Sequence, residues 1–169
     1  EACYQRSIAL KPDYVEAHNN LGFTFERQKK YDQAAECYKS ALRIDSRRAE
    51  LHFNLGNMLK ELEQYREAEA SYRRSLELKP DQVDAYNNLG NVLAYQRRFD
   101  EAATCYQRAL KLKPDQVDAY NNLGDLLADQ GRFDEAIAFL QQTILTHPNH
   151  PDLHCNLGSI LHDCGRVRE

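Results

Sequence analysis

Apolar and small residues recur along the chain at a fixed interval of 34 residues. The pair Leu-Gly marks each interval, at Leu21-Gly22, Leu55-Gly56, Leu89-Gly90, Leu123-Gly124 and Leu157-Gly158. We number the intervals so that this pair holds positions 7 and 8, which makes position 1 Val15, Ala49, Val83, Val117 and Pro151. Bulky or ring-bearing residues at positions 4 and 11 complete the i, i+3, i+4, i+7 spacing of one helical face. The first part of each interval is therefore predicted to be an amphipathic helix.

A second helix is predicted in the latter part of each interval, with its stripe at positions 20, 24, 27 and 28. Position 20 is always alanine, at Ala34, Ala68, Ala102 and Ala136. Position 24 is large, at Tyr38, Tyr72, Tyr106 and Leu140. A proline that stops the helix follows at Pro12, Pro80, Pro114 and Pro148, with Ser46 the one departure. Glycine at position 8 costs about 1 kcal/mol inside a helix, so we expect it to permit close approach of the second helix.

The two-helix unit repeats over the whole chain, which predicts an all-α protein. Complete units span 15–48, 49–82, 83–116 and 117–150. Residues 1–14 are expected to be the second helix of a preceding unit, and 151–169 the first helix of a truncated one. Residues 1–169 thus form a single predicted array of stacked antiparallel helix pairs, in which each unit contacts its neighbours. We expect it to be a segment of a longer array.

The residues at these positions resemble those of the tetratricopeptide repeat (TPR) family over essentially the whole chain. Residues 79–90 and 113–124 are even the same string, KPDQVDAYNNLG. The resemblance implies a right-handed superhelix, an α-solenoid, whose first helices line an inner, concave groove. In this family that groove is the usual place for a ligand.

Position 6 is asparagine in every interval, at Asn20, Asn54, Asn88, Asn122 and Asn156. More polar residues hold position 5 (Asn19, Asn87, Asn121) and position 9 (Asn57, Asn91, Asp125). At about 100° per residue, these positions lie opposite the predicted core stripe and therefore on the groove. Asparagine is less favourable than alanine in a helix by roughly half a kcal/mol, yet its amide offers a donor and an acceptor, as each peptide unit does. We predict that the row binds an extended polypeptide; the alternative is that it only ties neighbouring helices together.

The sequence suggests three functions, two from the groove residues and one from the ends of the array. The leading prediction is a non-catalytic protein–protein interaction module. The row and its Asn-Leu-Gly signature also resemble the TPR arm of O-linked N-acetylglucosamine transferases, in which position-6 asparagines hold the substrate polypeptide. That resemblance implies a substrate-recognition arm whose glycosyltransferase domain lies outside this chain. Family members that bind the acidic C-terminus of chaperones place Lys or Arg at positions 2, 5 and 6. Here position 2 is acidic and positions 5 and 6 carry no cation, which argues against that ligand.

The third hypothesis is a scaffold that assembles head to tail. It rests on apolar residues expected to be uncovered at the two ends of the array, Tyr4, Ile8, Leu157, Ile160 and Leu161.

Composition narrows the partners further. The formal net charge of −4 argues against nucleic acid, and no apolar run approaches the roughly 18 residues of a membrane span. The five cysteines lack the spacing of a disulfide framework, so we interpret them as reduced thiols of an intracellular, cytoplasmic protein.

Chemistry-bearing patterns are absent from the sequence once the repeats are aligned. We find no catalytic constellation and no phosphate-binding loop, and we therefore predict neither enzymatic activity nor a cofactor. Histidines and cysteines gather near the C-terminal end without metal-ligand spacing, so no metal site is predicted there. Among them, His154 is expected to be a buried core residue at position 4.

Overall fold

The computed structural model describes residues 1–165, and in that range it is all-α, as predicted. Ten helices follow one another: α1 Ala2–Leu10, α2 Val15–Arg27, α3 Tyr31–Ile44, α4 Ala49–Glu61, α5 Tyr65–Leu78, α6 Val83–Tyr95, α7 Phe99–Leu112, α8 Val117–Asp129, α9 Phe133–Thr146 and α10 Pro151–Asp163. Every even-numbered helix begins at position 1 of an interval, and the helices α3, α5, α7 and α9 begin at position 17.

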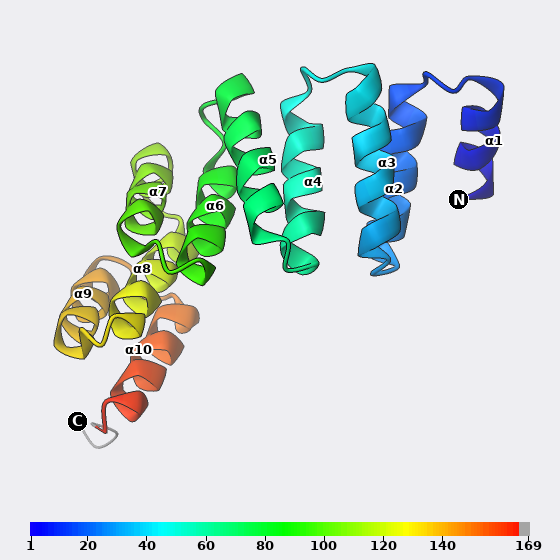
Figure 1. Ribbon diagram of the computed structural model, residues 1–169. Coiled ribbons are helices and arrows are strands. Elements are labelled where there is room, and N and C mark those ends of the chain that lie inside the picture. Colours follow the sequence, from blue (N-terminus) through cyan, green and yellow to red (C-terminus); the bar gives the residue numbers. More distant parts are fainter. Residues whose placement is uncertain (166–169) are drawn as a thin grey trace.

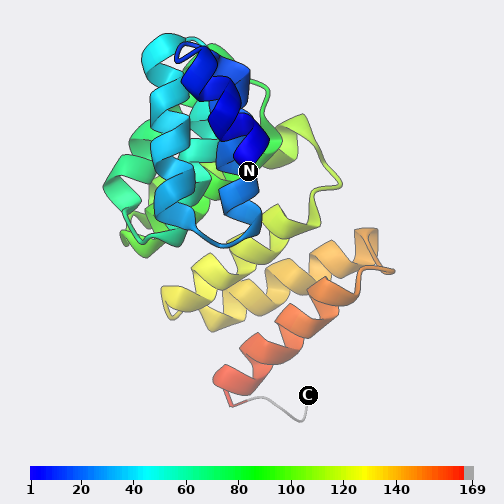
Figure 2. The ribbon, with the colours of Figure 1, turned by 90° about the vertical axis from the view of Figure 1, so that its right-hand side faces the viewer.

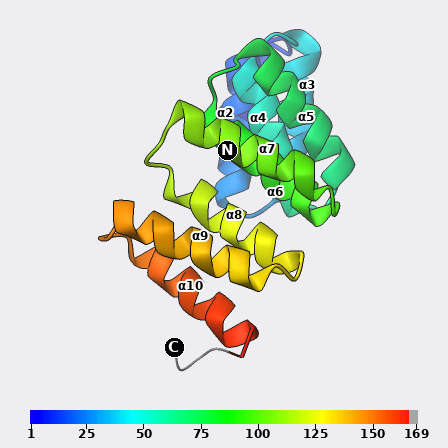
Figure 3. The same ribbon diagram turned by 90° about the vertical axis from the view of Figure 1, so that its left-hand side faces the viewer.

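The helices pack in antiparallel pairs, which stack into an α-solenoid (Figure 1). Successive first helices approach one another, α4 with α6, α6 with α8 and α8 with α10, whereas no two second helices in residues 1–165 lie comparably close. In Figure 1, α6, α8 and α10 lie on the inner side of the bend, and Figure 3 shows α7 and α9 from the outside. The first helices therefore line the concave face.

The direction of the helices rotates along the array. In the view of Figure 2, helices α2 and α3 run steeply, while α8, α9 and α10 run obliquely across the picture. The buried core is correspondingly divided into two clusters that meet at α8. Ala119 and Leu126 of α8 belong to the larger, N-terminal cluster, and Val117 and Leu127 pack against the smaller, C-terminal one.

The turn inside each helix pair has the same form in every repeat. Position 15 has a positive φ, at Lys29 (58°), Glu63 (58°), Arg97 (61°), Gly131 (74°) and Gly165 (78°). In the first repeat, Lys30 N–H donates to the Phe25 carbonyl (2.9 Å) and Lys29 N–H donates to the Glu26 carbonyl (2.8 Å). This is a Schellman motif. Its recurrence fixes the angle at which each second helix leaves the first.

Glycine at position 8 permits the close approach that the sequence predicts. A Cβ atom added to Gly22 would lie 2.8 Å from Cε1 of Tyr38, and one added to Gly56 would lie 2.7 Å from Cε1 of Tyr72. Both tyrosines are fully buried, as are the four alanines at position 20. The tyrosine rings of α3, α5 and α7 therefore pack directly on the backbone of the helix before them, and Leu140 of α9 takes the same place in the fourth pair.

The core stripe of the first helices differs from the predicted one. Position 3 is buried in all five, at Ala17, Leu51, Ala85, Ala119 and Leu153. Position 10 is buried in four, at Met58, Val92, Leu126 and Ile160. Helices α2, α4, α6 and α8 each pack against their own second helix and also against the preceding repeat, and α10 packs against the preceding repeat. A first helix therefore needs two apolar faces, and a single stripe accounts for only one of them.

Position 4 lies at the edge of the core, where Tyr86 and Tyr120 are partly buried and pack against the two clusters. His18 Nε2 donates to the Pro12 carbonyl (2.9 Å), His52 Nε2 to the Ser46 carbonyl (3.1 Å), and Tyr120 Oη to the Pro114 carbonyl (3.1 Å). These bonds hold the turn between repeats. His154 does the same with Pro148 (3.1 Å) and is exposed, so the expectation that it is buried is wrong.

The exposed apolar surface at the C-terminal end is also smaller than the sequence predicts. Ile160 is only 3% exposed because position 10 faces the preceding repeat, and Leu157 and Leu161 are partly buried against the same cluster. Tyr4 and Ile8 likewise pack against the N-terminal cluster. Head-to-tail association of the chain stays a prediction.

Replacing Gly56 with alanine should destabilise the array. The added Cβ would overlap the buried Tyr72 ring, and overpacking of about 1–3 kcal/mol exceeds the gain in helix propensity of about 1 kcal/mol. We expect a net loss of up to about 2 kcal/mol in the free energy of unfolding, measured by urea denaturation. Gly158→Ala is the matched control, because no atom of residues 1–165 outside its own helix backbone and chain neighbours lies within 4 Å of its added Cβ; it should stabilise by up to about 1 kcal/mol. Equal effects of the two changes would contradict this packing.

Candidate functional site

The position-6 asparagines all project from the first helices, but their surroundings differ. Asn20 is exposed, and Asn54, Asn88, Asn122 and Asn156 are half-buried. Position 6 therefore stays accessible from the concave side while contacting a neighbouring helix in most repeats.

Position 5 lies deeper than predicted. Asn87 is 8% exposed, Asn19 and Asn121 are half-buried, and Phe53 packs against the core. Asn87 is therefore too deeply buried to face the groove, whereas the placement of Asn19 and Asn121 on the groove stays a prediction. The Asn87 side chain lies between consecutive first helices, since the rotation between repeats brings the following helix over it.

Amide hydrogen bonds connect consecutive first helices. Asn88 Nδ2 donates to Asn57 Oδ1 (3.0 Å), from position 6 to position 9 of the preceding repeat. Asn122 Nδ2 donates instead to Asn87 Oδ1 (3.0 Å), from position 6 to position 5. In the last step Asn156 Nδ2 donates to the backbone oxygen (3.1 Å) and to Oδ1 (3.3 Å) of Asn121. The amide row thus has the structural role that the sequence left open as an alternative.

The corresponding hydrogen bond between Asn54 of α4 and Asn19 of α2 is not formed. Asn19 is equivalent to Asn87 and Asn121, but its Oδ1 atom is buried and has no partner in residues 1–165. Asn54 holds the donor position and forms no side-chain hydrogen bond in the same range. Bonding between the amides is therefore confined to the later repeats.

Two asparagines at position 9 are held by the buried tyrosines. Tyr72 Oη donates to Asn57 Oδ1 and Tyr106 Oη to Asn91 Oδ1, each at 2.8 Å. Burial raises the pKa of both phenols well above the usual value, so both stay protonated donors. Because the Oδ1 atoms face these hydroxyls, the Nδ2 groups of Asn57 and Asn91 are left without a partner among residues 1–165.

The sequence analysis did not predict this bond between positions 24 and 9, although the residue pattern contains a sign of it. Asn at position 9 occurs together with Tyr at position 24 in the second and third repeats only. In the first repeat position 9 is Phe23, and the Tyr38 hydroxyl donates to Glu26 Oε2 instead (3.0 Å). In the fourth repeat Asp125 accompanies Leu140, which has no hydroxyl.

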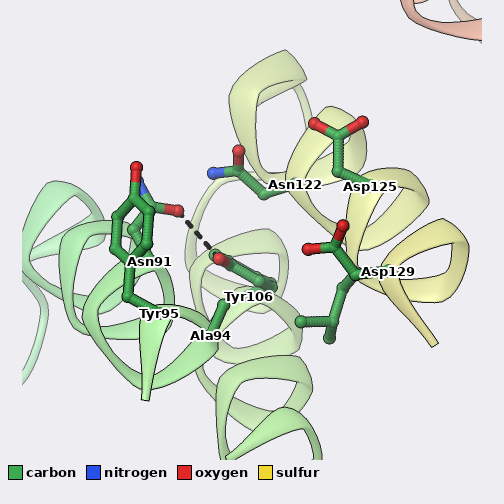
Figure 4. A pocket seen from close by; sticks show the side chains of 8 residues that line it. Asn91, Ala94, Tyr95, Tyr106, Asn122, Asp125 and Asp129 are labelled. Atoms are coloured by element: carbon green, nitrogen blue, oxygen red, sulfur yellow. Dashed lines mark hydrogen bonds between the residues drawn. The ribbon is translucent and has the colours of Figure 1, made fainter. Parts of the chain in front are cut away.

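Two cavities on this face each contain one position-9 and one position-6 asparagine. Asn57 and Asn88 line a cavity of about 460 Å³, and Asn91 and Asn122 line one of about 230 Å³ (Figure 4). The position-9 residue presents unpaired Nδ2 donors. The position-6 residue presents an Oδ1 that accepts no hydrogen bond from residues 1–165. Each cavity therefore offers a donor and an acceptor.

The described part of the chain shows no other candidate chemistry. Within residues 1–165, no three His, Cys, Asp or Glu side chains gather as a metal site would require. No helix in that range has both the length and the apolar character needed to cross a membrane. Burial raises the pKa of the Cys37 and Cys105 thiols to about 11, which leaves both protonated at neutral pH.

Comparison with known proteins gives a consistent result. Tetratricopeptide repeat models match residues 13–81, 47–115 and 87–152. A crystal structure of MamA superimposes with a TM-score of 0.81 at 25% identity, covering 86% of this chain and 85% of MamA. YrrB is described as a TPR protein with an unusual peptide-binding site. Its structure superimposes with a TM-score of 0.75 at 24% identity, and the match covers 98% of this chain and 85% of the YrrB chain. A search of curated proteins gives no match.

A third structure contains a bound peptide. The first TPR of Spaghetti (RPAP3), bound to the HSP90 peptide SRMEEVD, has a TM-score of 0.67 at 24% identity and covers 69% of this chain and 93% of its own. These structures establish the fold. The likeness of the asparagine row to the arm of O-linked N-acetylglucosamine transferases stays a prediction.

Replacing Asn57 and Asn20 separately should distinguish the two kinds of asparagine. Asn57→Ala leaves the buried Tyr72 hydroxyl without its acceptor, which should cost about 1–3 kcal/mol. Asn20→Ala removes an exposed amide that has no side-chain hydrogen bond within residues 1–165 and should stabilise slightly, by up to roughly half a kcal/mol. Urea denaturation of both variants measures the difference. Similar stabilities would show that the Tyr72–Asn57 bond contributes nothing.

Proposed function

Because the chain belongs to the tetratricopeptide repeat family, we propose that it is a non-catalytic protein–protein interaction module. It holds an extended segment of a partner polypeptide along the concave face formed by α2, α4, α6, α8 and α10. One observation carries the proposal: on this face, two successive cavities each offer an amide donor and an amide acceptor that have no partner among residues 1–165.

These groups match what a peptide backbone presents. Each peptide unit has one N–H and one carbonyl. In the first cavity, Asn57 Nδ2 would donate to a backbone carbonyl and Asn88 Oδ1 would accept a backbone N–H. Asn91 and Asn122 would do the same in the next cavity. Side chains of the ligand take no part in these bonds, so this recognition depends little on ligand sequence.

The spacing of the repeats suits an extended ligand. Packed helices lie about 8–10 Å apart, and an extended chain advances about 3.3 Å per residue. One repeat therefore corresponds to roughly three ligand residues, and a 12-residue peptide would span about four repeats.

Binding through these amides is expected to be weak. A single hydrogen bond contributes about 0.5–1.5 kcal/mol net, and ordering the ligand opposes it. Useful affinity would then require several repeats acting together. The position-2 acids on the rim also disfavour acidic ligands.

Loss of the two position-6 acceptors should abolish most of the binding. We expect Asn88→Ala/Asn122→Ala to raise the Kd for a pool of uncharged, fluorescein-labelled 12-residue peptides about tenfold or more, since at least two hydrogen bonds are removed. Fluorescence anisotropy measures the change, and circular dichroism verifies that the variant is folded.

The matched control removes two amides from the outer helices. Gln107 of α7 and Gln141 of α9 are exposed, and Gln107→Ala/Gln141→Ala should leave the affinity unchanged. Equal affinities of the wild type and Asn88→Ala/Asn122→Ala would refute the amide mechanism. Absence of any binding by the wild type would refute the proposed function itself.

A further inference from the structure

The smaller of the two cavities carries negative charge. It lies among α6, α7 and α8, and its lining includes Asp125 and Asp129 but no Lys, Arg or His. The two aspartates are one helical turn apart on α8, so their side chains are neighbours. Figure 4 shows their carboxylates on the α8 side of the cavity. Neither carboxylate forms a salt bridge within residues 1–165.

An aromatic ring forms the opposite wall. Tyr95 of α6 lines the cavity and is 65% exposed, and Figure 4 places it across from the two aspartates. Its ring stacks on Tyr65 with centroids 5.0 Å apart and an interplanar angle of 15°. This contact holds the ring in place while leaving much of it accessible. Tyrosine faces attract cations.

Two apolar residues also line the cavity. Ala94 and Leu126 contribute to its lining, and they could cover the methylene stem of a long side chain. A cavity of about 230 Å³ with a carboxylate pair, an aromatic wall and apolar lining residues therefore has the features that a long cationic side chain requires.

The larger cavity lacks this character. Arg27, Lys29 and Lys60 contribute cations to its lining. Its two glutamates already have partners, because Glu26 accepts from Tyr38 Oη (3.0 Å) and Glu61 pairs with Lys60 (3.3 Å). The negative charge available to a ligand is therefore concentrated at the Asn91–Asn122 end of the groove.

The surroundings of Asp125 also favour a cationic ligand. Burial raises the pKa of its carboxyl, Asp129 raises it further, and a hydrogen bond from Asn156 opposes both effects. No lysine or arginine among residues 1–165 acts on this carboxyl. A cation brought by a ligand would therefore meet a carboxylate pair that those residues leave without a positive partner.

We propose that this cavity selects a lysine or arginine side chain of the bound polypeptide. Its cationic group lies between the Asp125 and Asp129 carboxylates and the Tyr95 ring, while Asn91 and Asn122 hold the adjacent backbone. The inference rests on the proposed function, and it adds a charge preference to an otherwise sequence-tolerant groove.

Two peptides that differ at one residue test this preference. Both are fluorescein-labelled, 12 residues long and otherwise uncharged; the central residue is lysine in one and norleucine in the other. Ion pairing and cation–π contact together should make the lysine peptide bind about tenfold more tightly in anisotropy titrations at low salt. In Asp125→Asn/Asp129→Asn this preference should disappear, so that the lysine and norleucine peptides bind with equal affinity.

A control variant separates the cavity from the overall charge of the chain. Asp81 and Asp115 are exposed turn residues at the same repeat position, and Asp81→Asn/Asp115→Asn makes the same change in net charge. This variant should keep the lysine preference.

Each outcome discriminates between the two proposals. Equal wild-type affinity for the two peptides would overturn the charge preference and leave the proposed function standing. The same follows if the lysine preference persists in Asp125→Asn/Asp129→Asn. If the wild type binds neither peptide, the proposed function fails and this inference fails with it.

Discussion

The packing of a buried tyrosine on a glycine of the preceding helix is the contact on which the rest of this structure depends. At Gly56 there is no room for even one additional carbon, because the Tyr72 ring lies against the backbone. The same ring carries a hydroxyl that crosses to the concave side and bonds Asn57 (2.8 Å). One side chain therefore closes the helix pair and also orients an amide on the groove. Core packing and the candidate binding surface are coupled through it.

In each of these asparagines, one atom of the amide bonds within the array and the other remains available to a ligand. At position 6 the Nδ2 group bonds the preceding repeat, as in Asn88 and Asn122, and Oδ1 remains available. At position 9 the Oδ1 atoms of Asn57 and Asn91 bond the buried tyrosines, and Nδ2 remains available. The helix propensity lost by placing asparagine here is thus offset partly by bonds within the array. A structural role and a binding role are compatible because each amide has two distinct ends.

The sequence predicts the helices and the close approach of the second helix at glycine well, because both follow from residues close together within one repeat; that a tyrosine ring makes this contact is shown by the structure. The prediction fails for residues whose burial or bonding is determined by contacts between repeats. Burial of Asn87 and Ile160 arises because a first helix packs on two neighbours, and one stripe cannot reveal the second contact. The bond from Tyr106 to Asn91 requires knowing which atoms meet across a helix pair. The approach of Tyr95 to Asp129 depends on the rotation between repeats, which no single repeat specifies.

The central claim is that the position-9 amides donate to the backbone of a bound polypeptide. The most direct measurement is a titration of ¹⁵N-labelled protein with the uncharged norleucine peptide, followed through the side-chain NH₂ resonances of asparagine and glutamine. This account predicts that the resonances of Asn57 and Asn91 shift on binding, while those of Gln107 and Gln141 on the outer helices do not. Unchanged Asn57 and Asn91 resonances in the presence of saturating peptide would contradict it.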